Sequence, residues 1–167
     1  MQAMSDAALP SPIAVIKATS PETMERLGAR LGARLRKGDV VALDGGLGAG
    51  KTTFARGLIR ALAGPGTIVP SPTFTLVQIY AAPAFDLWHC DLYRLSGPGE
   101  TAELGLEEAF ADAVVLIEWP DRLGPLMPQR RLRIGIAYGT DEESRELTFE
   151  GDRSWADRLT GIADDDA

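Results

Sequence analysis

The sequence has one cysteine, Cys90, and no apolar run that approaches the roughly 20 residues of a membrane span. A single cysteine excludes an internal disulfide and fits a reducing compartment such as the cytoplasm. Residues 1–12 lack the basic region and apolar stretch of a secretory signal, so we expect a flexible extension there. With 167 residues, the chain suits one domain, which we place at residues 13–162. We expect residues 163–167 to form a disordered acidic tail.

Basic residues are also scarce. The chain has 17 Lys and Arg against 24 Asp and Glu, a net charge of −7. Residues 1–98 carry 10 basic and 7 acidic side chains (+3), and residues 99–167 carry 7 and 17 (−10). Nucleic-acid-binding domains usually present a basic face or stripe. The nearest candidate, Arg130 to Arg133, flanks a predicted strand, so we expect no strong direct binding to RNA or DNA.

The most informative segment is present at residues 45–52, which read Gly-Gly-Leu-Gly-Ala-Gly-Lys-Thr. This is the G-x-x-x-x-G-K-[ST] pattern of a phosphate-binding loop. Its glycines permit positive φ angles and a close backbone approach to an anion, and successive N–H groups can form a nest for phosphate oxygens. Lys51 can reach the β- and γ-phosphates of a nucleotide, and the Thr52 hydroxyl can ligate Mg²⁺.

The flanking sequence supports this interpretation. Residues 39–44 form a short apolar run, which indicates a buried strand. Phe54, Leu58 and Leu62 repeat every four residues and predict a helix that ends at residues 64–66, Gly-Pro-Gly. The positive end of that helix would face bound phosphates. The alternative, a glycine-rich turn that merely contains a lysine, does not require this order of strand, loop and helix.

The remaining elements predict an α/β fold. We expect a P-loop NTPase-like, three-layer arrangement with a mixed, mostly parallel central sheet, and ligands outside the carboxyl ends of its strands. Ser20 is a candidate N-cap, followed by Pro21, for a helix that ends near Gly38. The predicted strands are residues 13–18, 39–44, 74–80, 85–93, 113–119, 132–138 and 145–149, with short helices at 98–110 and 154–162.

Two acidic residues follow strand-like runs and are candidates for the chemistry. Glu118 comes directly after Val114 to Ile117, the pattern of a buried strand leading to a magnesium-binding acid. Asp91 ends a less apolar run and could orient an attacking water, act as a base, or bind Mg²⁺ through water. The alternatives are ordinary ion pairs, of Glu118 with Arg122 and of Asp91 with Arg94.

Three further side chains allow two interpretations each. Trp119 could pack on a substrate or partner at the mouth of the site, or belong to the core. Thr73 could sense the γ-phosphate, as switch residues do, or simply start a strand. His89 lies two residues before Asp91, so the two should share a strand face, and a pairing is possible. A buried packing role is the simpler interpretation of His89.

Four short blocks are informative together. They read Gly46-Leu47-Gly48-Ala49-Gly50-Lys51-Thr52-Thr53, Ser71-Pro72-Thr73-Phe74-Thr75-Leu76, His89-Cys90-Asp91-Leu92-Tyr93-Arg94-Leu95 and Ile117-Glu118-Trp119-Pro120. In order and spacing, over residues 13 to 150, the chain resembles the TsaE (YjeE) family of bacterial tRNA threonylcarbamoyladenosine biosynthesis ATPases. The family's first block often has an acid where this chain has Gly46.

The resemblance implies a small Mg²⁺-dependent ATPase that works with the proteins TsaB and TsaD and contacts tRNA only through them. It implies catalytic roles for Lys51, Asp91, Glu118 and Trp119, and Mg²⁺ ligands in Thr52 and Glu118. It also places ATP or ADP on the first block, residues 46–53. Thr73, the candidate γ-phosphate sensor, is a further expected nucleotide contact. By the same resemblance, Thr19 and Arg145 are candidate nucleotide contacts.

Two other functions fit a phosphate loop. A small-molecule kinase would need an arginine-bearing lid, and residues 122–133 are the only lid candidate. Their prolines suit a fixed connection better. A non-enzymatic nucleotide switch is the other possibility, and a GTPase is disfavoured because no Asn-Lys-x-Asp guanine signature is present.

Overall fold

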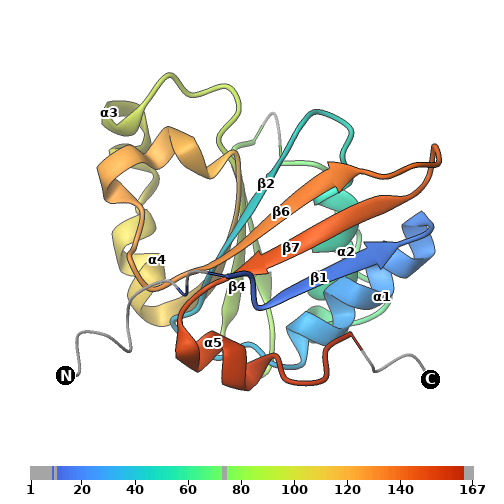
Figure 1. Cartoon of the computed structure of the whole chain (residues 1–167). Coiled ribbons are helices and arrows are strands. Elements are labelled where there is room, and N and C mark those ends of the chain that lie inside the picture. The colour runs from blue at the N-terminus through green and yellow to red at the C-terminus, as the bar shows by residue number, and fades with distance from the viewer. Residues whose placement is uncertain (1–8, 10, 73–74, 164–167) are drawn as a thin grey trace.

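The computed structural model describes residues 9, 11–72 and 75–163. These residues contain a seven-stranded sheet with the strand order β1-β7-β6-β2-β5-β4-β3 (Figure 1). Most of the predicted extension and tail, residues 1–8, 10 and 164–167, lies outside this description. The strands are β1 Ala14–Ala18, β2 Val40–Gly45, β3 Val77–Ala81, β4 Asp86–Asp91, β5 Ala113–Glu118, β6 Leu132–Tyr138 and β7 Arg145–Glu150.

Strand direction in the sheet matches the predicted mixed, mostly parallel pattern. The central strands β6, β2, β5 and β4 pair in parallel. β3 pairs with β4 in antiparallel register, and β7 lies antiparallel between β6 and β1. Five of the seven strands therefore run in one direction. Two antiparallel hairpins are present, β3–β4 and β6–β7.

The helices are α1 Pro21–Gly32, α2 Lys51–Ala63, α3 Pro98–Thr101, α4 Leu106–Asp112 and α5 Arg153–Arg158, with 3₁₀ turns η2 Ala102–Leu104 and η3 Pro120–Leu126. Ser20 caps α1 as predicted, because its hydroxyl accepts a hydrogen bond from the Thr23 N–H at 3.2 Å. The predicted end of this helix near Gly38 is wrong. After Gly32 the backbone forms three-residue turns, and Leu35 still packs into the core from outside the helix. The apolar residues therefore keep their helical spacing beyond Gly32, where the helix itself ends.

Helices cover both faces of the sheet, as the three-layer prediction requires. α1 and α2 pack together on one face, and α3 and α4 lie on the other (Figure 1). α1 and α2 are in close contact at Gly57, where a Cβ would lie 2.0 Å from the Glu25 carbonyl oxygen. This contact positions α2, and with it the segment that precedes α2, against the sheet.

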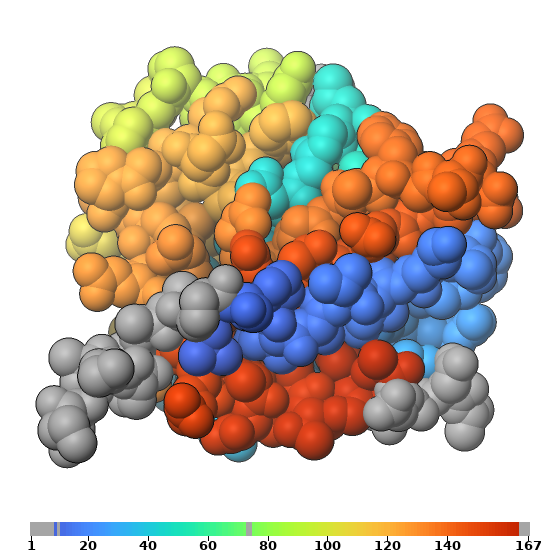
Figure 2. Space-filling view, in the orientation of Figure 1, coloured from blue at the N-terminus to red at the C-terminus, as the bar shows by residue number. Residues whose placement is uncertain are grey.

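One edge strand of the sheet is β1, whose side chains alternate between exposed and partly covered. The space-filling view looks onto this edge, with β1 in front and the C-terminal segment around α5 below it (Figure 2). Within the described ranges, none of the helices combines the length and the apolar character needed to cross a bilayer.

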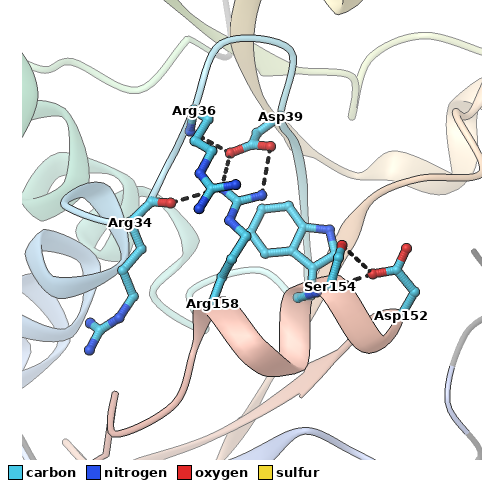
Figure 3. Close-up of polar contacts among 7 residues, drawn as sticks. Arg34, Arg36, Asp39, Asp152, Ser154 and Arg158 are labelled. Atoms are coloured by element: carbon cyan, nitrogen blue, oxygen red, sulfur yellow. Dashed lines mark hydrogen bonds and ion pairs between the residues drawn. The ribbon is translucent and has the colours of Figure 1, made fainter. Parts of the chain in front are cut away.

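Helix α5 is attached to the turn before β2 through Arg158. Its guanidinium donates to both carboxylate oxygens of Asp39 and, at 2.8 Å, to the Arg34 carbonyl oxygen (Figure 3). It also lies 4.1 Å from the ring centre of Trp155. The side chains of Arg158 and Asp39 are only 13% and 12% exposed. Loss of either partner would leave the other charge largely buried without compensation.

We therefore expect Arg158→Ala to lower the free energy of unfolding by about 3 kcal/mol, measured by urea denaturation. Arg153→Ala, on the exposed side of the same helix, is the matched control and should change it by less than about 0.5 kcal/mol. The pair lies at the opposite end of β2 from residues 46–50, so ATP affinity should not change. Equal stability of the two variants would contradict this role of Arg158.

Candidate nucleotide-binding site

The predicted phosphate loop connects β2 to α2 at the carboxyl end of β2. Gly50 has a φ angle of 108°, and a Cβ there would lie 2.9 Å from the Met24 Cε. Both the angle and the contact favour glycine at this position. The Ala49 N–H donates to the Gly46 carbonyl at 3.1 Å, which closes the turn. Helix α2 then begins at Lys51, so its N-terminus faces the loop, as expected.

The loop borders a cavity of about 280 Å³. All four predicted catalytic residues lie on its wall, together with most of the predicted nucleotide-binding residues. The lining residues are Leu47, Gly48, Ala49, Gly50, Lys51, Thr52, Thr53, Ser71, Asp91, Glu118 and Trp119. Thr53, the end of the first block, precedes Asp91 by 38 residues and Glu118 by 65, and the structure brings all of them into one cleft.

The two acids lie side by side because of the sheet. Asp91 and Glu118 are partners in the parallel register of β4 and β5, and both are nearly buried, at 5% and 3% exposure. The Thr52 hydroxyl donates to the Glu118 Oε2 at 3.1 Å. A hydroxyl and a carboxylate in contact are the oxygen ligands that Mg²⁺ uses beside nucleotide phosphates, so these residues fit the predicted cation.

Glu118 does not form the ion pair with Arg122 that was the alternative interpretation. The Arg122 guanidinium instead contacts Asp121 at 3.2 Å and the Tyr93 carbonyl at 3.5 Å. Asp91 Oδ1 accepts a hydrogen bond from the Tyr93 N–H at 3.0 Å, which fixes the carboxylate at the start of the loop after β4.

His89 has a hydrogen-bond partner that the sequence did not predict. Its side chain is fully buried, and its Nε2 lies 2.7 Å from the Glu118 Oε2. The pairing considered from sequence was with Asp91, on the same strand. The partner is on the neighbouring strand instead, and strand order cannot be read from the spacing of residues along one strand.

Lys51 is held inside the loop in this structure. Its ammonium donates to the carbonyl oxygens of Gly45, at 2.5 Å, and Gly46, at 3.1 Å. It also lies 4.1 Å from the ring centre of Trp119. Burial lowers the pKa of Lys51 below its usual value, although the carboxylates of Glu118, Asp91 and Asp44 act in the opposite direction. Phosphate oxygens would replace the carbonyl oxygens as partners of this ammonium.

Trp119 lines the cleft next to Lys51. Its backbone is in the left-handed region, with φ 60°, which is uncommon for a bulky residue and turns the chain sharply after β5. Its ring packs against Tyr93, with ring centres 4.8 Å apart. Trp119 lines the cleft and also packs, half-buried, against the core on one face of the sheet, so contact with a substrate or partner stays a prediction.

Arg145 contacts the phosphate loop from outside the cleft. Its guanidinium donates to the carbonyl oxygens of Ala49, at 2.9 Å, and Gly48, at 3.4 Å. Tyr138 was missed by the sequence: its hydroxyl donates to the Leu47 carbonyl, and its ring lies 4.7 Å from the Arg145 guanidinium. No motif marks Tyr138, which is simply the exposed last residue of β6. These two residues hold three successive loop carbonyls.

Two other predicted contacts remain predictions. Thr19 is exposed at the junction of β1 and α1, its hydroxyl lies 3.5 Å from that of Thr23, and it is not among the described residues that line the cleft. Thr73 lies outside the described residues.

A phosphate loop between a buried parallel strand and a helix, with two acids at the ends of neighbouring strands, defines a P-loop NTPase-like α/β protein. The family model for the threonylcarbamoyl adenosine biosynthesis protein TsaE matches residues 18–147. The chain belongs to the TsaE family. This confirms the resemblance drawn from the four sequence blocks.

Individual relatives agree with this assignment. The tRNA threonylcarbamoyladenosine biosynthesis protein TsaE of Rickettsia bellii is 40% identical over 124 residues, covering 74% of this chain and 86% of the relative. The protein of the same name from Bacillus subtilis is 40% identical over 134 residues, covering 80% and 82%. The crystal structure of Bacillus subtilis YdiB is similar, with a TM-score of 0.76, 30% identity, and coverage of 97% of this chain and 98% of that one.

Proposed function

We propose that this chain binds ATP with Mg²⁺ and hydrolyses it as a component of the machinery that makes tRNA threonylcarbamoyladenosine. The observation that carries the proposal is one cleft in which Lys51, Thr52 and Glu118 meet at a phosphate loop. The relatives described above bear the name of that biosynthesis, which supports the assignment of the pathway.

The cleft residues would divide the chemistry among them. Lys51 and the loop N–H groups would hold the β- and γ-phosphates and stabilise charge that develops during transfer. Thr52 and Glu118 would hold Mg²⁺, which supplies further neutralisation of the phosphate oxygens. Asp91, buried at the same edge of the sheet, would orient or deprotonate the attacking water. Trp119 would cover the phosphate end of the cleft.

The lining of the cleft bears on partner dependence. Among the described residues that line it, there is no arginine. Phosphoryl transfer commonly needs an arginine that stabilises the transition state, and either Arg94, three residues after Asp91, or a second protein could supply it. We propose that TsaB and TsaD, the partners implied by the family, stimulate hydrolysis. The net charge of −7 supports contact with tRNA through these partners.

Part of the possible kinase lid, residues 122–133, is held against the core. Residues 120–126 form the turn η3, and Leu123 within it is buried in the core on one face of the sheet. A lid needs a segment that is weakly held. The small-molecule kinase is therefore the weaker candidate and serves as the alternative outcome of the experiment below.

The test measures ATP hydrolysis with and without the TsaB and TsaD proteins. The wild type should be slow alone and faster with both partners, and Glu118→Ala should lose the stimulated rate. Glu146→Ala, which removes an exposed acid on β7, is the matched control and should behave as the wild type. If partners add nothing and a small-molecule acceptor is phosphorylated, the proposal is wrong.

Trp119 gives a direct signal of nucleotide binding. When phosphates draw the Lys51 ammonium away from the indole ring, the environment of Trp119 changes. We expect ATP with Mg²⁺ to alter the tryptophan emission, and Trp119→Phe to lose most of that change, measured by fluorescence titration. Trp88 and Trp155 remain in the variant as internal references. A full change in the variant would place the signal elsewhere.

A further inference from the structure

His89 is the only histidine of the chain, and it lies fully buried beside the candidate magnesium site. Its Nε2 is 2.7 Å from the Glu118 Oε2. Its other ring nitrogen, Nδ1, is buried and has no hydrogen-bond partner among the described residues. One ring nitrogen therefore has a hydrogen-bond partner, and the other has none among the described residues.

A carboxylate accepts hydrogen bonds, so the Nε2 must carry the proton that joins the ring to Glu118. The Nε2–H is therefore the donor of this contact, and Nδ1 has no partner among the described residues.

This donor acts on one oxygen of Glu118. Oε2 accepts from both the His89 Nε2 and the Thr52 hydroxyl, which lies 3.1 Å away. Among the described residues, Oε1 accepts no hydrogen bond. Two donors on one oxygen hold the carboxylate in a single orientation, and Oε1 stays available to the cation or to its water.

We propose that His89 is a positioning residue for the magnesium site and acts by holding the Glu118 carboxylate through its Nε2–H. The proposal rests on the proposed function, because it assigns Glu118 to Mg²⁺. Hydrogen-bond donors behind metal-binding side chains commonly set their orientation, and their loss costs about 10- to 100-fold in metal affinity.

Packing alone does not explain a histidine here. Its neighbours on the same face and in register, Leu87 and Leu116, are fully buried leucines in the core between the sheet and α1–α2. An apolar side chain would fill this place without leaving a buried nitrogen unpaired. What the imidazole adds is the donor to Glu118.

The first experiment measures the affinity of Mg²⁺ for the protein–ATP complex by calorimetric titration of Mg²⁺. His89→Leu should weaken it at least about tenfold. His89→Gln places an amide N–H at a similar reach from the backbone and should recover most of the affinity. Cys90→Ala is the matched control, because Cys90 is equally buried on the opposite face of β4 and should keep wild-type affinity.

Wild-type affinity in His89→Leu would overturn the proposal, and so would a Gln variant no better than the Leu variant. Failure of the proposed function looks different: in that case the wild type itself shows no Mg²⁺-dependent binding of ATP.

A second experiment needs no variant. Because the chain has one histidine, ¹⁵N labelling of histidine gives the NMR signals of a single imidazole once any purification tag is removed. The expected spectrum shows a proton on Nε2. A ring whose only proton is on Nδ1 would contradict the assigned hydrogen bond to Glu118.

Discussion

Replacing Lys51 by methionine should lower the rate of partner-stimulated ATP hydrolysis by about 100- to 1000-fold, the cost of removing one preorganised charged donor from a phosphoryl-transfer site. The side chain is 5% exposed and lies on the cleft wall at the first residue of α2. Methionine keeps the apolar stem and removes only the charge. The affinity for ATP–Mg²⁺, measured by calorimetry, should fall as well.

The same variant should fold at least as well as the wild type. Burial lowers the pKa of Lys51, so the folded protein binds fewer protons than the unfolded chain between the lowered pKa and the ordinary value of 10.5. In that window the stability of the nucleotide-free wild type rises with pH, because deprotonation removes the cost of burying the charge. Lys51→Met should lose this rise, measured by urea denaturation across alkaline pH.

Lys37→Met, at an exposed position, is the matched control for both measurements and should leave them unchanged. Unchanged ATP affinity in Lys51→Met would show that the loop holds phosphates by its N–H groups alone.

The fold was largely predictable because its signals are local. The phosphate loop, the cap at Ser20, the glycine and proline stops and the apolar run at residues 113–118 each specify backbone within a few residues. A buried strand that ends in an acid has to place that acid along the carboxyl ends of the strands, where the ligand binds. For this reason Glu118, and with it Asp91 and Thr52, could be assigned to one site before the strand order was known.

Contacts between strands could not be predicted in the same way. His89 meets Glu118 only because β4 lies beside β5, and Arg145 reaches the loop carbonyl groups only because the turn between β6 and β7 lies next to the loop. No spacing of residues along the sequence marks either contact. The resemblance placed Arg145 near the nucleotide, but its contacts in the structure are with the backbone that would hold the nucleotide.

Asp91 carries the second large expected effect. Asp91→Asn should lower kcat for stimulated ATP hydrolysis by about 100-fold or more, the usual contribution of a positioned base, while the affinity for ATP changes little. Asparagine keeps an Oδ1 acceptor for the Tyr93 N–H, so the loop after β4 and the packing of Tyr93 on Trp119 should survive. The variant removes the negative charge and basicity and keeps this acceptor.

Asp91→Ala separates the chemical role from the structural one, because it also removes the acceptor for Tyr93. If hydrolysis depends on the carboxylate, both variants lose kcat, and only the alanine variant also changes the Trp119 emission in the absence of nucleotide. If Asp91→Asn keeps the wild-type kcat while Asp91→Ala does not, Asp91 serves only to order the loop. The acid that acts on the attacking water would then have to be Glu118, the other described carboxylate on the cleft wall.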